Sequence, residues 1–155
     1  MGIGSWSESD QAMMRVALVE ARIAETDGEV PVGAIVVAAN KIIGKGHNRS
    51  IRDHDPSAHA EIVALREAGL AQKNHRLVGA TLFVTLEPCA MCVGALIQAR
   101  IARLVFGAYD AKAGALGSVI DLSAERALNH RLEVNGGLLA EECSGLLSDF
   151  FAKQR

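Results

Sequence analysis

Two short motifs bring together side chains that can hold a metal ion and use it for chemistry. The first is His59-Ala60-Glu61, and the second is Pro88-Cys89-Ala90-Met91-Cys92. A catalytic zinc site takes three protein ligands, often imidazole and thiolate, and leaves the fourth position for water. The predicted ligands are His59, Cys89 and Cys92. The carboxylate of Glu61 is placed to accept a proton from that water and return it to a leaving nitrogen, so the predicted chemistry is hydrolysis.

The spacing of the two cysteines indicates that they share one face at the start of a helix. Residues three apart lie side by side on a helix surface. Pro88 directly before them suits a helix start, where its missing N–H costs little. The first helical turn carries the positive end of the helix dipole, which favours the thiolate form that binds metal.

His59 and Glu61 place a stricter condition on the structure. Two residues that are two positions apart on a regular helix point about 200° away from each other. Both side chains can face one metal only if His59 stands at the start of its helix and the metal lies over that end. The sequence therefore predicts a helix boundary within a residue or two of His59.

The surrounding elements alternate between strands and helices, which predicts a single α/β domain over residues 1–155. The expected strands are 32–39, 42–46, 81–85, 103–107 and 131–134. The expected helices are 10–26, 59–71, 89–100 and 138–152, with residues 1–8 frayed. Helix 89–100 is apolar around most of its circumference and is expected to lie in the interior. Seven of the residues in 107–118 are Gly or Ala, and such a backbone can approach a ligand closely.

Composition narrows the class of protein. Half of the 155 residues are apolar, which allows a substantial core without a stapling metal. Three cysteines, two of them in Cys-x-x-Cys, do not suit a secreted disulfide framework. With no targeting or membrane segment apparent, we expect a cytoplasmic protein. Residues 41–112 hold ten basic and six acidic side chains, an excess that suits either a phosphate-facing surface or ordinary solvated faces.

The motif has other interpretations besides catalytic zinc. Cys-x-x-Cys alone is also typical of redox pairs and of half zinc ribbons. A non-enzymatic zinc module needs a fourth protein ligand, and none stands near the motif. Cys143 lies on an apolar helical stripe and is predicted to be a core residue. His47, His54, His75 and His130 have no ligand spacing.

The stretches around the motif carry a resemblance to a known family. They are Glu29 to Ala34, His47-Asn48-Arg49, Asp55 to Glu61, Ala80 to Cys89, Val105 to Ala108, Asp110 to Lys112, Asn129 to Arg131 and Leu146 to Phe151. His-x-Glu with Pro-Cys-x-x-Cys is the signature of nucleobase zinc deaminases, of which the tRNA deaminases are an established example. Along nearly its whole length the chain resembles the bacterial tRNA-specific adenosine deaminase family, within the cytidine-deaminase-like superfamily.

The resemblance implies a three-layer α/β/α fold with a five-stranded mixed sheet, a homodimer and one zinc ion per subunit. It implies hydrolysis of the wobble adenosine in a tRNA anticodon stem-loop to inosine and ammonia. The substrate-binding residues that it implies are Asn48, Val32, Ala60, Leu86, Pro88, Asp110, Lys112 and Phe151. Deamination of a free base or nucleoside, such as guanine or cytidine, on the same scaffold stays open as the alternative.

Overall fold

One five-stranded sheet organises the protein, which we describe over residues 6–154 from a computed structural model. Its strands are β1 (Gly33–Ala38), β2 (Lys41–His47), β3 (Thr81–Leu86), β4 (Arg103–Ala108) and β5 (Glu133–Gly136). Their order in the sheet is β2-β1-β3-β4-β5. Strand β1 runs antiparallel to both β2 and β3, whereas β3, β4 and β5 are mutually parallel. The sheet is therefore mixed, as expected.

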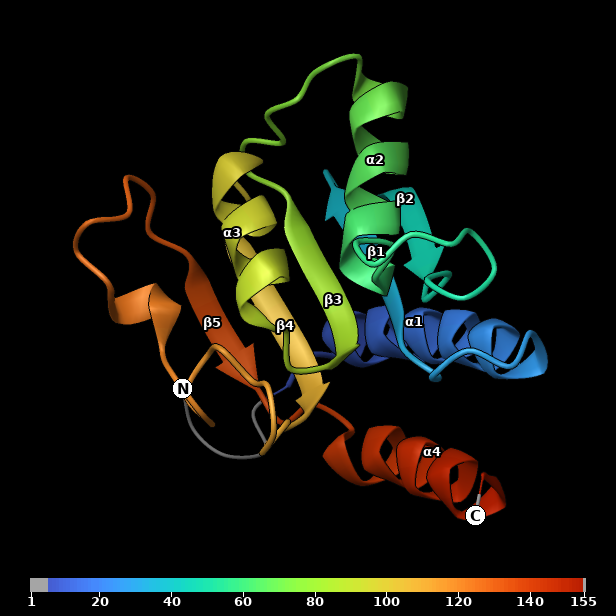
Figure 1. The fold of residues 1–155 in the computed structure, drawn as a ribbon. Helices are drawn as coiled ribbons and strands as arrows, with labels where there is room; N and C mark the ends of the chain where they lie inside the picture. Colours follow the sequence, from blue (N-terminus) through green and yellow to red (C-terminus); the bar gives the residue numbers. More distant parts are fainter. Residues whose placement is uncertain (1–5, 155) are drawn as a thin grey trace.

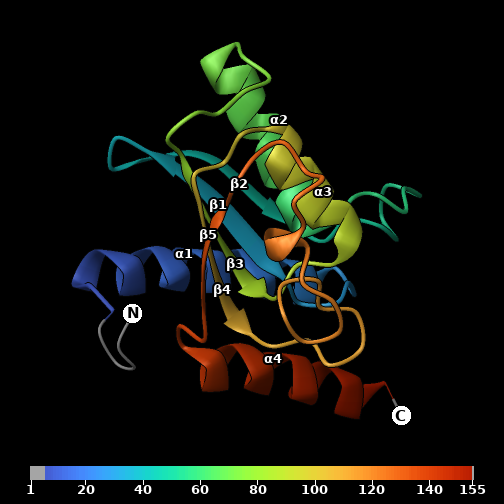
Figure 2. The ribbon, with the colours of Figure 1, turned by 90° about the vertical axis from the view of Figure 1, so that its left-hand side faces the viewer.

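In the described part of the chain, four α-helices cover the sheet. They are α1 (Glu8–Thr26), α2 (Ala60–Gln72), α3 (Ala90–Gln98) and α4 (Ala140–Lys153), and a short 3₁₀ helix, η1 (Leu122–Ala124), precedes β5. Helices α2 and α3 lie on one face of the sheet, and α1 and α4 lie on the other (Figures 1 and 2). This is the predicted three-layer α/β/α arrangement.

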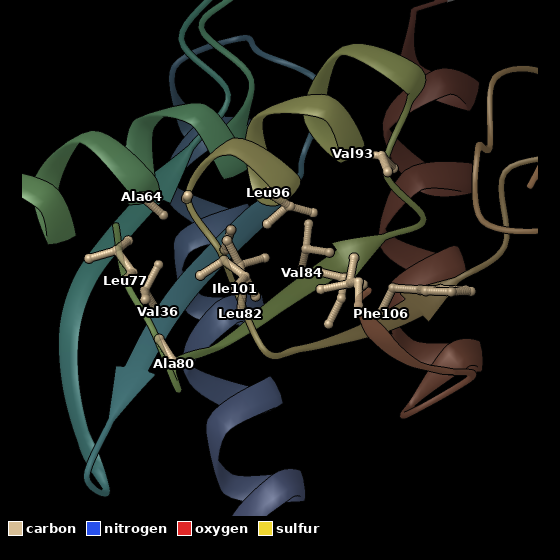
Figure 3. Close-up of a cluster of buried hydrophobic side chains, with 14 of the residues drawn as sticks. Val36, Ala64, Leu77, Ala80, Leu82, Val84, Val93, Leu96, Ile101 and Phe106 are labelled. Carbon is tan, nitrogen blue, oxygen red and sulfur yellow. The ribbon is translucent and has the colours of Figure 1, made fainter. Parts of the chain in front are cut away.

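Alternating side chains of the inner strands fill two cores, one on each face of the sheet. Val36, Leu82 and Val84 belong to the cluster beneath α2 and α3, which Figure 3 shows together with Leu96. The neighbouring positions, among them Phe83, belong to the cluster beneath α1 and α4. Because successive strand residues point to opposite faces, the continuous apolar runs in these strands fit a sheet that is covered on both sides.

Strand β2 brings α2 unusually close to the sheet. A Cβ atom added to Gly46 would stand only 2.5 Å from the carbonyl oxygen of Ala60 and 2.5 Å from the amide nitrogen of Ala64. Only glycine leaves room for the helix backbone at this distance. The first turn of α2, which follows His59 directly, therefore rests on β2.

The N-terminal expectation was partly wrong. Helix α1 begins at Glu8, and the hydroxyl of Ser7 accepts a hydrogen bond from the Asp10 N–H at 2.9 Å. Trp6 packs, half-buried, against the core. A capped helix start next to an anchored indole is ordered, so the predicted frayed segment does not include residues 6–8. The rest of that prediction, over residues 1–5, lies outside the described residues.

Two further expectations, on the burial of α3 and on the start of β5, were wrong. Helix α3 is not wholly interior, because the sheet covers only one of its sides and Met91 remains 40% exposed. Strand β5 begins at Glu133, two residues later than predicted, because pairing of Glu133 with Arg103 of β4 sets its register. Within residues 6–154, no helix is both long and apolar enough to cross a membrane.

Candidate active site

Two helices begin at the same end of the sheet, where β3 and β4 finish (Figure 1). His59 is the N-cap residue of α2 and Cys89 is the N-cap residue of α3, both with extended backbone. Neither side chain caps its own helix by a hydrogen bond, so both are free to bind something else. The predicted helix boundary at His59 is thus confirmed, and Cys92 follows in the first turn of α3.

The three predicted ligands come together with spacings that suit zinc. The ligand atoms of His59, Cys89 and Cys92 all lie within 4.8 Å of one another. The Nδ1 atom of His59 is 3.6 Å from the Cys89 sulfur and 3.5 Å from the Cys92 sulfur. Zn–N and Zn–S bonds of ordinary length at a tetrahedral angle place nitrogen and sulfur about 3.6 Å apart. The donor set therefore fits zinc in both chemistry and spacing.

Asn48 fixes the start of α2 in place of the missing cap. Its Oδ1 atom accepts a hydrogen bond from the Ala60 N–H at 2.9 Å, and its Nδ2 atom donates to the Val30 carbonyl at 3.0 Å. Because Ala60 adjoins His59, this amide holds the imidazole's helix against the segment that leads into β1. One hydrogen and one lone pair of the amide stay available for a ligand.

Glu61 lies in the first turn of α2 and is almost fully buried, with 4% of its surface exposed. Burial raises the pKa of its carboxyl group to about 7. The pKa of the neighbouring Cys89 thiol shifts downward. A hydrogen bond from Cys92, and to a smaller extent one from His59, lowers it to about 3. The site thus holds a thiolate sulfur beside a carboxyl group that can take up or release a proton near neutral pH.

A small cavity of about 180 Å³ opens at this cluster. Its walls consist of Val30, Val32, Asn48, His59, Glu61, Leu86, Glu87, Cys89, Asp110 and Ala113. Four of the eight predicted substrate-binding residues are in this lining: Val32, Asn48, Leu86 and Asp110.

The other four predicted substrate-binding residues lie outside the lining. Ala60 is fully buried in the first turn of α2, and the Pro88 carbonyl accepts a hydrogen bond from the Ala115 N–H at 2.9 Å. Lys112 is exposed on the segment after β4. Phe151 is 48% exposed on α4 and packs edge-on against Phe150. These four can reach a substrate only outside the cavity or through the backbone.

Sequence reasoning missed Glu87, which is 2% exposed and lines the cavity. Burial alone would raise the pKa of this carboxyl group, but hydrogen bonds from Ser118 and from backbone N–H groups hold the pKa below its usual value. A charged residue at the end of a buried apolar strand was the one available signal. Val30 and Ala113 were missed as well, and nothing in their side chains distinguishes them from ordinary apolar residues.

A third buried carboxylate holds a segment that joins two residues of the cavity lining. Glu29, also 2% exposed, accepts hydrogen bonds from the N–H groups of Ile51 at 3.2 Å and Arg52 at 2.8 Å. These residues belong to the segment that connects Asn48 with His59. Arg52 also pairs with Asp27 at 3.1 Å. Part of the basic excess in residues 41–112 is thus used in ion pairs within the chain.

Comparisons with known proteins agree on one family of deaminases. The cytidine and deoxycytidylate deaminase zinc-binding region matches residues 7–108. The tRNA-specific adenosine deaminase of Haemophilus influenzae is 55% identical over 150 residues, covering 96% of this chain and 87% of that protein. The tRNA-specific adenosine deaminase of Bacillus subtilis is 46% identical over 146 residues, covering 94% of this chain and 91% of that protein.

Solved structures agree. One from studies of A-to-I editing by tRNA:A34 deaminases at the wobble position is similar with a TM-score of 0.86 and 43% identity, covering 88% of this chain and 99% of that chain. A guanine deaminase from Nitrosomonas europaea is more distant, with a TM-score of 0.77 and 28% identity, covering 92% and 84%. Fold and site together define a zinc-dependent deaminase. More narrowly, the chain belongs to the tRNA-specific adenosine deaminase family.

Metal removal should free two of the three thiols. We expect Cys89 and Cys92 to resist alkylation in the purified protein and to react after chelation, because zinc-bound sulfur is blocked. Cys143 should stay unreactive in both states, since it is 1% exposed and burial raises its pKa to about 12. Mass spectrometry of the alkylated peptides measures this, with denaturant releasing Cys143 as the control. Equal labelling of Cys89 and Cys92 before and after chelation would contradict the ligand assignment.

Proposed function

We propose that this protein hydrolyses the 6-amino group of the wobble adenosine in a tRNA anticodon stem-loop, giving inosine and ammonia. The observation that carries the proposal is that His59, Cys89 and Glu61 line the same small cavity in a chain of this family. One water enters and one ammonia leaves, so the reaction needs a metal-ligand set, a proton carrier and a pocket for the base, and no redox cofactor.

The proposed division of labour follows the geometry. His59, Cys89 and Cys92 hold one zinc ion, which when bound supplies a Lewis acid that lowers the pKa of water towards about 7. Glu61, buried against the same cavity, accepts a proton there and delivers it to the purine ring and the departing amino group. Asn48 and Val32 border the base, and Leu86 closes the wall beside Cys89.

The size of the cavity favours one base as its occupant. Sites for whole drug-sized ligands measure about 300–1,000 Å³, whereas this cavity measures about 180 Å³. A base of a nucleic acid reaches such a pocket only after it leaves its stack, and loop bases leave at low cost. The ribose and phosphates then lie outside, where we place Asp110 and the exposed Lys112 beside the flipped nucleotide or its neighbours. Ala60, Pro88 and Phe151 are proposed to contribute around this rim.

We also propose that two copies of the chain form a homodimer, with α2 and α3 at the interface. A groove of about 1020 Å³ runs between these helices, with Leu65 and Leu70 of α2 opposite Ala95 of α3. Leu70 is 81% exposed, and Met91 extends the apolar surface along α3. An apolar surface of this kind is typical of an interface, and a second copy would cover the side of α3 that the sheet leaves open. The proposed compartment is the cytoplasm, which keeps zinc-binding thiols reduced.

A substrate panel tests the activity. We expect adenosine-to-inosine conversion in an anticodon stem-loop with adenosine at the wobble position, measured by sequencing or by nucleoside mass spectrometry. Free adenosine, cytidine and guanine should remain unchanged, because they lack the backbone that lies outside the cavity. Turnover of guanine or a free nucleoside without activity on the stem-loop would favour the alternative reaction instead.

Replacing Glu61 with Gln tests the proton carrier. The amide keeps the shape of the side chain but cannot accept and return a proton, so we expect zinc to be retained and kcat on the stem-loop to fall by about 10²–10⁴-fold. Zinc content by mass spectrometry and single-turnover rates are the measurements. The matched control is Glu67→Gln, an exposed carboxylate on the same helix, which should leave the rate unchanged. Near-normal turnover by Glu61→Gln would remove Glu61 from this role.

The interface is tested by charge insertion. Leu70→Glu should shift the protein from dimer to monomer, because the carboxylate would be buried without a partner. Val78→Glu is the matched control, since Val78 is 78% exposed but lies outside the groove. Light scattering coupled to size-exclusion chromatography gives the mass of each variant. A wild-type monomer, or equal behaviour of the two variants, would overturn the proposed interface.

A further inference from the structure

The segment that follows β4, which we call the 110–118 loop, forms one wall of the cavity without a core of its own. Asp110 and Ala113 line the cavity. The loop contains turns, one isolated bridge residue and no regular helix or strand. Ala115 and Leu116 fix its middle in the core cluster beneath α2 and α3, but its other side chains are small, polar or exposed, so a further source must hold its two ends.

That source is the carboxylate of Glu87. Its Oε1 atom accepts a hydrogen bond from the Asp110 N–H at 3.0 Å. Its Oε2 atom accepts from the N–H groups of Leu116 at 3.0 Å and Ser118 at 3.2 Å. The Ser118 hydroxyl also donates to Oε1. Four donors from both ends of the loop thus converge on one buried acceptor-only group, and charge-assisted hydrogen bonds of this type are the strong ones.

The 110–118 loop packs tightly against this carboxylate, with no room for an added side chain at Gly114. A Cβ atom added to Gly114 would stand 2.4 Å from the carboxyl carbon of Glu87 and 2.5 Å from each of its oxygens. The loop therefore folds directly over the carboxylate. The backbone reinforces the connection, because the Glu87 N–H donates to the Ala108 carbonyl at 2.8 Å and the Ala115 N–H donates to the Pro88 carbonyl at 2.9 Å.

We propose that Glu87 is the positioning residue for the 110–118 loop, and that it sets the distance between the Asp110 wall of the base pocket and Cys89. It acts through the loop, since its oxygens are occupied by loop donors and it stands outside the His59–Cys89–Cys92 group. Cys89 follows Glu87 by two residues, so one short stretch of backbone carries both the proposed zinc ligand and the anchor of the pocket wall. This inference rests on the proposed function and specifies how its pocket is built.

Glu87→Gln is the primary test variant. The amide places an NH₂ donor against backbone donors, so the loop loses part of its anchor while the volume of the side chain is kept. We expect zinc content to stay at the wild-type level, and hydrogen exchange at the amides of Asp110, Leu116 and Ser118 to speed up. We expect kcat/KM on the stem-loop to fall by up to about 100-fold, mainly through KM, because a displaced wall misplaces the base.

A double-mutant cycle separates positioning from general destabilisation. If Glu87 acts through Asp110, Glu87→Gln should add little further loss in an Asp110→Ala background. The matched comparison is Glu29→Gln, an equally buried carboxylate that accepts backbone hydrogen bonds from the opposite segment. Its loss should add in full to that of Asp110→Ala. Additive behaviour of Glu87→Gln, or unchanged amide exchange in the loop, would overturn the proposal.

Two further variants keep the test decisive if Glu87→Gln does not fold. Gly114→Ala should reproduce the loop exchange and the rise in KM, because its methyl group displaces the loop from the same carboxylate. Ser118→Ala should give a smaller change in the same direction. Wild-type activity in the same assay tests the proposed function separately: an inactive wild type with loop amides that respond to Glu87→Gln would refute the function and leave the anchor standing.

Discussion

The constraint on which the structure depends is that two helices must begin at one point, over the carboxyl ends of β3 and β4. His59 and Cys89 are the N-cap residues of these helices, and neither uses its side chain to cap. Two positive helix ends therefore face the cluster, which favours thiolate sulfur. Several surrounding residues hold the two helix starts in this position. Gly46 lets α2 rest on β2, Asn48 holds the first amide of α2, and the buried strand β3 delivers Cys89.

Three buried carboxylates, two of them in the cavity lining, illustrate how environment divides roles among identical groups. Glu29 and Glu87 each accept hydrogen bonds from backbone N–H groups of a neighbouring segment, and so they serve as fixed acceptors. Within residues 6–154, Glu61 has no comparable set of backbone N–H donors from another segment, and burial raises the pKa of its carboxyl group to about 7. At Glu87, hydrogen-bond donors outweigh the effect of burial on the pKa, whereas at Glu61 burial dominates. The proposed proton carrier thus lies near carboxylates that hold neighbouring segments of the chain in place.

Much of this was predictable from the sequence, for physical reasons. Short-range spacing encodes the cluster: Cys89 and Cys92 on one turn, and His59 at a helix start that its relation to Glu61 required. Alternating apolar runs and helical stretches encode the three layers. The anchoring by Glu87 was not predictable, because its partners are backbone N–H groups in a Gly/Ala-rich segment, and these carry no side-chain signature. The exposed side of α3 was also missed, since an apolar helix surface does not reveal whether its own chain or a second copy covers it.

The proposed chemistry depends on one zinc ion held by one imidazole and two thiolates, with a fourth position left for the reaction. X-ray absorption at the zinc edge of the purified protein tests it most directly. We expect two sulfur scatterers at about 2.3 Å and two nitrogen or oxygen scatterers at about 2.0–2.1 Å. Cys89→Ser should remove one sulfur from this shell, and Cys143→Ser should leave it unchanged. A third sulfur, or a shell without sulfur, would contradict the account.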